Sequence, residues 1–244
     1  MVCQLCKQDA PLVKSHIIPR SFYRIVKNRG NNELNILSNI ANEHPKKSRI
    51  GIYDKIVCES CERLFSPWDD YTQALLLRKI SNQIPLIVDN QVLAYRLEGI
   101  DYHKLKLFFI SLLWRASVSS HKFFSKIQTG RFEPLLNKAI RENDPGNNNF
   151  FSVNLAKFNK DLGTAMLDPH PERFEGVNYY RFYLAEYIAH IKVDQRRASP
   201  ILSDVALSQD KPLIIINRDL HKSAEFRVLQ DIIRTIPQTV MPEA

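Results

Sequence analysis

The chain has 244 residues, of which 44% are hydrophobic and 25% charged, so it is long enough to bury a core and allows one large domain or two modest ones. The apolar residues 107–114 fall far short of the roughly 18 to 20 that a membrane-spanning helix needs. Cys3, Cys6 and Lys7 interrupt the place where the apolar part of a signal peptide would lie. These features exclude an integral membrane protein and a secreted disulfide-dense scaffold, and we expect a protein of the reducing cytoplasm.

The formal net charge of +8 is unevenly distributed along the chain. Residues 1–70 carry 11 basic and 8 acidic side chains, residues 71–147 carry 11 and 6, and residues 148–244 carry 12 of each. The excess is therefore +3, +5 and zero in the three segments. A basic surface attracts polyanions such as nucleic acid, although a solubilising surface would have the same composition.

The four cysteines form two Cys-x-x-Cys pairs, Cys3 with Cys6 and Cys58 with Cys61. Two such pairs in an intracellular chain are typical of a site in which four thiolates bind one zinc ion. A closed shell of four sulfur ligands leaves no position for a substrate, so this zinc would be structural. The alternative is that the cysteines form two unrelated redox or buried pairs.

The segment after the first cysteine pair is basic and surrounds a histidine. Residues 12–19 read as a short strand that contains His16 and ends at Pro19, and residues 21–28 read as a short amphipathic helix. Because this stretch holds five basic side chains and no acidic one, we expect phosphate contacts beside His16, with a solvated helix face as the alternative. The five are Lys14, Arg20, Arg24, Lys27 and Arg29.

The next elements lead through the second cysteine pair. Residues 30–49 are predicted to be a polar loop or mobile flap, and residues 51–57 a strand. Ser66 as N-cap and Pro67 as first helical residue predict a helix that ends near residue 79. Asp69 and Asp70 are then expected to serve as a cap and as surface residues.

The remaining two thirds of the chain predict a helical region followed by an α+β region. We expect a linker with one short strand at 91–97, a strongly apolar core helix at 104–119 that buries Trp114, a helix at 132–141 and a turn at 144–146. Strands are predicted at 151–158, 179–184, 187–193 and 212–217, and a helix at 223–236. The sequence contains no glycine-rich nucleotide loop and no other common catalytic motif in this part.

The order of motifs in residues 1–70 resembles that of zinc-stabilised HNH, or ββα-metal, endonucleases. The pattern of that family is Cys-x-x-Cys, Asp-His-Ile-Ile-Pro, a strand that begins with asparagine, and a second Cys-x-x-Cys whose next residue opens a helix. Here Ser15-His16-Ile17-Ile18-Pro19 and Val57-Cys58-Glu59-Ser60-Cys61-Glu62 match this order. With the helix at residues 111–115, the chain is also similar to uncharacterised bacterial HNH-like proteins, for some of which a role in phage defence is suspected.

The resemblance implies roles for individual residues. His16 matches the general base that removes a proton from the attacking water, and an imidazole that is largely neutral at pH 7 suits this task. The positions of the divalent-metal ligands, for Mg²⁺ or Mn²⁺, hold Ser15 and Glu62. The asparagine of the pattern is missing and its place holds Tyr53 and Asp54. The missing ligand could come from Asp54, Asn42, His44, Asp69 or Asp70.

Two of these roles have plain structural alternatives. His16 could be a strand histidine that donates to a backbone carbonyl, and Glu62 could be a solvated carboxylate in the first turn of a helix. The departures at Ser15 and Asp54 place the catalytic metal in question, although they leave the zinc site untouched.

Taken together, the sequence predicts an α+β protein in which a treble-clef-like ββα-metal zinc module (1–80) precedes a linker and helical region (81–147) and an α+β C-terminal domain (148–244). The predicted function is metal-dependent hydrolysis of DNA phosphodiester bonds, with structural Zn²⁺, catalytic Mg²⁺ or Mn²⁺, and a role in phage defence. RNA stays open as a substrate, as do a homo-oligomer and a partner ATPase or sensor protein. The alternatives are a non-catalytic zinc-stabilised module that binds nucleic acid or protein, and a chain whose functional part is the C-terminal domain.

Overall fold

A large mixed sheet forms the centre of the molecule. The structure is a computed structural model that describes residues 1–27, 33–37, 46–79, 82–160, 162, 165–227 and 230. Within this part of the chain, seven strands pair side by side, and all neighbours are antiparallel except β12 and β7, which are parallel. In sheet order the strands are β5 (Ile84–Val88), β6 (Gln91–Leu97), β12 (Leu213–Arg218), β7 (Val153–Phe158), β11 (Tyr187–Lys192), β10 (Val177–Leu184) and β9 (His170–Phe174).

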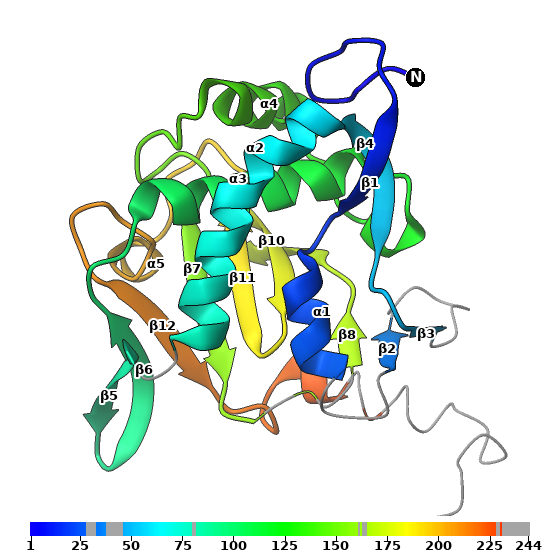
Figure 1. Cartoon of the computed structure of the whole chain (residues 1–244). Helices are drawn as coiled ribbons and strands as arrows, with labels where there is room; N and C mark the ends of the chain where they lie inside the picture. The colour runs from blue at the N-terminus through cyan, green and yellow to red at the C-terminus, as the bar shows by residue number, and fades with distance from the viewer. Residues whose placement is uncertain are drawn as a thin grey trace, which may run out of the picture.

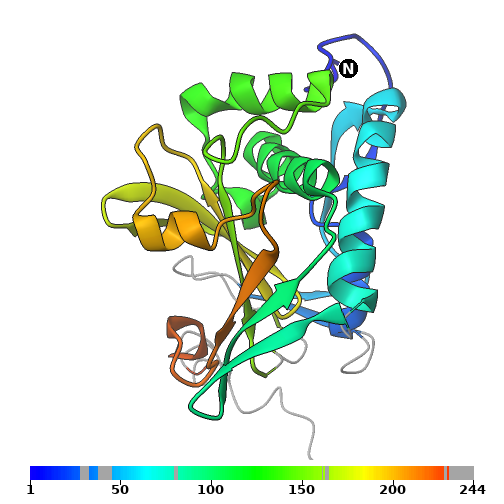
Figure 2. The ribbon, with the colours of Figure 1, turned by 90° about the vertical axis from the view of Figure 1, so that its left-hand side faces the viewer.

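Three helices lie together beside this sheet (Figures 1 and 2). They are α2 (Glu59–Gln73), α3 (Tyr102–Val118) and α4 (Glu133–Glu142), and α3 packs against both of the others. Residues 105–116 of α3 are all buried, which confirms the predicted core helix and the burial of Trp114. Asp101 caps α3 by accepting a hydrogen bond from the Lys104 amide, as short acidic side chains do at helix starts.

The N-terminal part of the chain forms a strand pair on which a helix packs. The strands β1 (Leu12–His16) and β4 (Tyr53–Cys58) run antiparallel, and α2 follows β4 without a loop and contacts both. Helix α1 (Arg20–Lys27) comes after β1, and its Phe22 ring lies 6.2 Å from that of Phe108 in α3. The ββα order therefore exists in this chain, and α3 covers it.

A second, smaller sheet joins the N-terminal part of the chain to a strand of the C-terminal half. Strand β2 (Leu34–Leu37) pairs antiparallel with β3 (Lys46–Ser48) and parallel with β8 (Ala165–Leu167). The short helix α5 (Pro200–Asp204) lies between β11 and β12 in the chain. None of the described helices is both long and apolar enough to cross a membrane.

One hydrophobic core connects all three segments that the sequence suggested. Its buried members run from Cys3 to Ile215, and a second cluster lies around Phe158, Tyr183 and Leu220. The boundaries at residues 80 and 147 remain predictions, but the side chains on both sides of each boundary share this core. The α+β class is confirmed by the mixed sheet and its helices.

Helix α2 begins earlier than predicted. It starts at Glu59 directly after Cys58, so the expected N-cap at Ser66 is wrong and Pro67 lies inside the helix. Proline removes one helical hydrogen bond, but Ser66 and Pro67 lie on the exposed side, where water can satisfy the freed carbonyl. The opposite side of the helix buries Phe65 and Trp68. Their packing stabilises the helix on both sides of Pro67.

Two predicted irregular segments also contain strands. Strands β2 and β3 lie within residues 30–49, which were expected to be a polar loop. Residues 80–100 were expected to hold one strand but form the β5–β6 hairpin, whose two turn residues Asp89 and Asn90 both have positive φ. Of the helix predicted at 223–236, residues 224–227 and 230 are helical, and residues 231–236 lie outside the described part.

Candidate functional site

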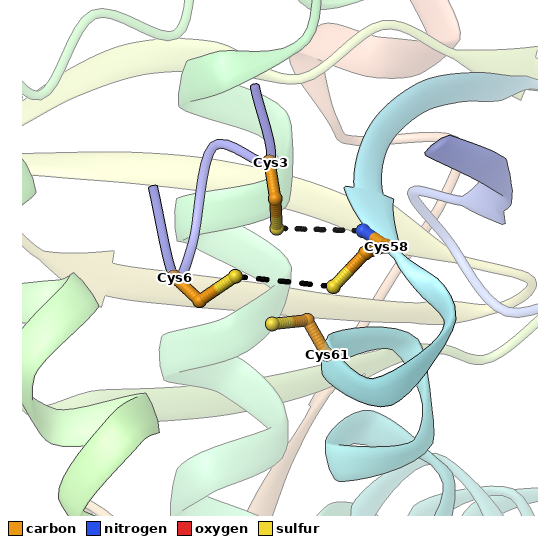
Figure 3. A group of neighbouring side chains, drawn as sticks. All are labelled: Cys3, Cys6, Cys58 and Cys61. Atoms are coloured by element: carbon orange, nitrogen blue, oxygen red, sulfur yellow. Dashed lines mark hydrogen bonds between the residues drawn. The ribbon is translucent and has the colours of Figure 1, made fainter. Parts of the chain in front are cut away.

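The four cysteines converge on one point at the N-terminal end of α2 (Figure 3). Their sulfur atoms all lie within 4.8 Å of one another, and Cys6 Sγ lies 3.9 Å from Cys58 Sγ. In a tetrahedron with zinc–sulfur bonds of about 2.3 Å, the sulfur atoms would be about 3.8 Å apart. The cluster therefore has dimensions that could hold a zinc ion.

Local backbone structure brings the two pairs together. The Lys7 amide donates to the Cys3 carbonyl over 2.9 Å in a tight turn, and Lys7 has a φ of 61°. The Cys58 amide donates to Cys3 Sγ over 3.3 Å, which ties the turn to the end of β4. Helix α4 supports the turn from outside, because Asn137 Nδ2 donates to the Leu5 carbonyl.

The thiols differ in their ease of ionisation. The hydroxyl of Ser60, 3.2 Å from Cys58 Sγ, is the main cause that lowers the pKa of Cys58 to about 6. Burial raises the pKa of Cys61, and the neighbouring cysteines raise it further. Cys58 therefore ionises readily to a thiolate, whereas Cys61 needs a nearby cation before its thiol loses its proton.

His16 lies at the end of β1 and is held by the turn before β4. Its Nε2 is 3.2 Å from the Ile50 carbonyl oxygen, and because a carbonyl only accepts, Nε2 carries the proton and Nδ1 keeps its lone pair. Burial is the largest cause that lowers the pKa of His16, assisted by Arg20 and Arg115. The half-buried ring is therefore neutral near pH 7 and can accept a proton at Nδ1.

Ser15, which precedes His16 in β1, and Glu62 of α2 form a second polar pair. Ser15 is fully buried on β1, and Glu62 lies in the first turn of α2. Burial raises the pKa of Glu62, and the nearby Ser15 hydroxyl and Arg115 partly offset this. The Ser15 hydroxyl interacts with Glu62, but neither Ser15 Oγ nor Glu62 Oε2 makes a hydrogen bond of good geometry within the described residues. Buried oxygen atoms without well-formed hydrogen bonds call for a water or a cation.

A buried arginine from α3 joins this region to the core. Arg115 donates from Nη1 and Nη2 to both carboxylate oxygens of Asp69, over 3.0 and 2.8 Å, and from Nη1 to the His16 carbonyl over 3.0 Å. Its guanidinium also lies over the Phe65 ring at 4.8 Å. The expectation that Asp69 is a cap or a surface residue is wrong, because Asp69 is an ion-pair partner on the inner side of α2.

The other predicted residues are more scattered. Asp54 accepts hydrogen bonds from the hydroxyls of Ser119 and Ser120 and from two backbone amides, so its carboxylate anchors the chain after α3. These bonds lower the pKa of Asp54 against the effect of burial. Asp70 is exposed, whereas Asn42 and His44 lie outside the described residues.

Three of the five basic residues can be placed on the surface around His16. Lys14, Arg20 and Arg24 are exposed on β1 and α1, and Lys14 Nζ lies 4.9 Å above the ring of Tyr53. The backbone of Lys27 ends α1, and Arg29 lies outside the described residues. This part of the surface presents positive charge next to a neutral histidine.

The fit of a second metal ion to this region rests on few ligands. Apart from the four cysteines, no group of three or more His, Cys, Asp or Glu ligands converges within the described residues. Glu62 and Ser15 supply two hard oxygen atoms that lack a well-formed hydrogen bond, and so few ligands suit an ion that keeps most of its waters. Arg115 adds a positive charge nearby that opposes such an ion, and Asp69 offsets this charge.

Sequence reasoning missed Arg115 and the Ile50 carbonyl. A single arginine within the apolar run of α3 was a usable signal, since a charge in a buried helix needs a partner. The Ile50 carbonyl carries no side-chain signal and is revealed only by the fold. No protein-family model, curated protein or solved structure matches this chain.

Proposed function

We propose that the N-terminal part of this chain is a zinc-stabilised, treble-clef-like ββα-metal module that hydrolyses phosphodiester bonds of DNA. Support for structural zinc comes from the spacing of the four sulfur atoms and from the burial of three of the four cysteines. Zinc would fasten β4 and α2 to the N-terminal turn. It would take no part in the reaction, because four protein ligands complete its coordination.

The observation that carries the hydrolase proposal is the combination of His16 with the oxygen pair of Ser15 and Glu62. Nε2 of His16 is fixed by the Ile50 carbonyl, and Nδ1 is left to accept a proton. Within the described residues, Ser15 Oγ and Glu62 Oε2 lack a well-formed hydrogen bond. Metal-assisted hydrolysis requires a general base and hard oxygen ligands in one region, and Arg115 and Asp69 interact electrostatically with both His16 and Glu62.

In this mechanism His16 takes a proton from water at Nδ1, and its bond to Ile50 keeps the ring oriented as the charge develops. Lys14, Arg20 and Arg24 hold the phosphate backbone through its negative charge. Glu62 and Ser15 would hold the divalent ion, which stabilises negative charge on the phosphate and on the leaving oxygen when it is bound.

A binding module without catalysis is the second candidate. The observation that favours it is Arg115, because its positive charge lies near Glu62 and weakens the attraction of a divalent ion. Such a module needs only the basic surface of β1 and α1, and its affinity for DNA falls steeply with salt. A role in phage defence would be compatible with either activity.

The test compares plasmid nicking in Mg²⁺ or Mn²⁺ by the wild type, His16→Ala and His103→Ala at equal zinc content. His103 is a matched control, because its Nε2 also lies near a backbone carbonyl, that of Asn143, but at the start of α3. We expect the wild type and His103→Ala to cleave equally, and His16→Ala to lose 10²-fold or more, on the order of a general-base contribution.

Glu62→Gln tests the metal role separately. It should abolish metal-dependent cleavage without changing the bound zinc, because Glu62 is not among the four clustered ligands. Equal cleavage by wild type and His16→Ala would exclude His16 as the base. No cleavage by any variant, with salt-sensitive DNA binding intact, would support the binding module instead.

A further inference from the structure

The β5–β6 hairpin extends the large sheet beyond its other strands (Figures 1 and 2). Strand β6 pairs with β12 over residues 94–97, whereas its pairing with β5 already begins at residue 91. Because β5 is the last strand of the sheet, one of its edges faces no other strand of the described residues. The tip of the hairpin therefore projects from the body of the molecule with an unpaired strand edge.

This hairpin gathers large apolar side chains that are exposed. Of the eleven exposed large hydrophobic residues among the described ones, five lie in the hairpin, each between 37% and 59% exposed. They are Ile84, Leu86, Ile87, Val88 and Leu93. All five residues of β5 are exposed, and none of them is charged. Such a cluster of exposed apolar side chains is typical of an interaction surface.

The opposite edge of the sheet has the reverse character. Strand β9 carries Pro171, Glu172 and Arg173, and Arg181 of β10 holds the Glu172 carboxylate. Proline and charged side chains on an edge strand protect it from pairing with another chain. Pairing of β5 with β9 of another copy, which would build open fibres, is therefore disfavoured. Of the two edges of this sheet, β5 is the one that is open to association.

The turn of the hairpin determines which backbone groups of β5 face outward. Its two residues both have positive φ, and the turn closes on the pair of Val88 and Gln91. The closing pair of such a turn is hydrogen-bonded, and bonded positions alternate along an antiparallel strand. Val88 therefore bonds to β6, whereas Ile87 and Pro85 direct their backbone groups to the free edge. A proline is tolerated in β5 because its missing amide would face outward.

We propose that β5 pairs antiparallel with β5 of a second copy of this chain, around a two-fold axis at Leu86. In this register Ile84 of each copy lies opposite Val88 of the other. The Ile87 amide of each copy donates to the Pro85 carbonyl of the other. A symmetric pair uses both free edges and closes at a dimer. The proposal does not depend on the hydrolase activity, since it rests on other residues.

The composition of β5 favours this occupant over a strand of another protein. Charge complementarity selects specific partners, and β5 offers no charge that could select a foreign strand. An identical strand brings no like charges together, and Ile84, Leu86 and Val88 form one apolar row with their counterparts. The missing amide of Pro85 and the short strand keep the interface small. We expect a reversible dimer with a dissociation constant on the order of 10 µM.

The test is analytical ultracentrifugation of the full-length protein from about 1 to 200 µM. The wild type should shift from monomer to dimer over this range. Leu86→Lys and Leu86→Glu should each dimerise about 100-fold more weakly, because the axis sets like charges opposite each other and removes two apolar contacts. An equimolar mixture of these two variants should recover dimers, since opposite charges then meet. Ile201→Lys is the control, because Ile201 is 75% exposed on α5, and it should dimerise as the wild type does.

Hydrogen exchange locates the interface within the hairpin. The Ile87 amide should exchange more slowly at high than at low protein concentration, whereas the Val88 amide, already bonded to β6, should not change. A wild type that stays monomeric at about 200 µM overturns the proposal and leaves the edge to a strand of another protein. Normal dimers of Leu86→Lys, or a mixture that does not associate, also overturn it. Oligomers larger than a dimer would exclude the two-fold pairing.

Discussion

Replacing Arg115 with methionine removes the guanidinium but keeps an unbranched side chain that can fill much of its space. In the wild type the Arg115 side chain is 1% exposed and that of Asp69 is 20% exposed. The substitution deletes two bonds to Asp69 and one to the His16 carbonyl. It leaves the Asp69 carboxylate on the inner side of α2 without a counter-charge.

Removing one partner of a buried ion pair typically lowers the free energy of unfolding by about 3 to 5 kcal/mol. Because Asp69 keeps some contact with solvent, we expect a loss near the lower end, about 3 kcal/mol. In a chain of this size that corresponds to a melting temperature lower by roughly 6 to 12 °C. Burial already raises the pKa of Asp69 despite Arg115, so the unpaired carboxyl should take up a proton below neutral pH. The loss should therefore be larger at pH 8 than at pH 5.

Urea unfolding of Arg115→Met, of Asp69→Leu and of the double variant measures how much free energy of unfolding each substitution removes. The double variant should recover most of the stability, because it leaves no unpaired charge. Arg63→Met is the control: it removes an exposed pair with Glu59, which contributes about 0.3 to 0.5 kcal/mol. A loss below 1 kcal/mol for Arg115→Met, or a double variant as unstable as the single one, would refute the reasoning.

Three further predictions concern single residues. Cys61→Ser should release the bound metal and lower the melting temperature, as measured by metal analysis and thermal unfolding, and wild-type zinc content in the variant would contradict a four-sulfur site. Gly51→Ala should lose about 1 to 3 kcal/mol in urea unfolding, because Gly51 has a φ of 80° and a Cβ there would lie 2.5 Å from Tyr23. Burial lowers the pKa of Lys106 from 10.5 to about 7, so the unfolded chain binds more protons between these values and stability should rise with pH across this window. Lys106→Met should flatten that rise, which reaches up to about 1.4 kcal/mol per pH unit, and an unchanged slope would refute the assignment.

Helix α3 was predictable because its information is local. Its residues are apolar on nearly all sides over four turns, and such a run is typical of a helix that is buried in a protein core. The cysteine cluster was predictable for a similar reason, since the spacing within each pair fixes a turn and the four thiols share one chemistry. In both cases no distant partner had to be known.

The start of α2 was mispredicted because packing against the core, and not the local pattern of helix-starting residues, determines where this helix begins. Ser66 and Pro67 form a favourable helix start. The helix nevertheless begins directly after its N-cap Cys58, and the buried ring of Phe65 packs against Trp114 of α3. The β5–β6 hairpin was missed although Asp89 and Asn90 carry the residue types that such a turn prefers. Its strand β5 is exposed throughout and therefore lacks the alternation of a half-buried strand.

The pairing of Arg115 with Asp69 could not be predicted from sequence, because 46 residues separate the two. The burial of His190 and Lys192 is equally invisible in the sequence, because both are polar and yet every residue of β11 is buried. His190 lies inside the network of Glu172 and Arg181. Polar residues on a central strand signal either solvent or a buried network, and only the neighbouring strands decide between them.

The hydrogen bond from Arg115 to the His16 carbonyl makes helix α3 part of the candidate site around His16. The ββα order of β1, β4 and α2 lies within the first 80 residues, but the carbonyl of His16 is held by a residue of α3. Helix α3 is buried in the core that extends to β12, so the position of His16 depends on the folding of the C-terminal half. The module of β1, β4 and α2, which we propose to act through His16, is therefore coupled in stability to the segments that follow it. Changes in the packing of α3 should alter the pKa of His16 before they alter the cysteine cluster, whose described ligands all come from residues 3–61.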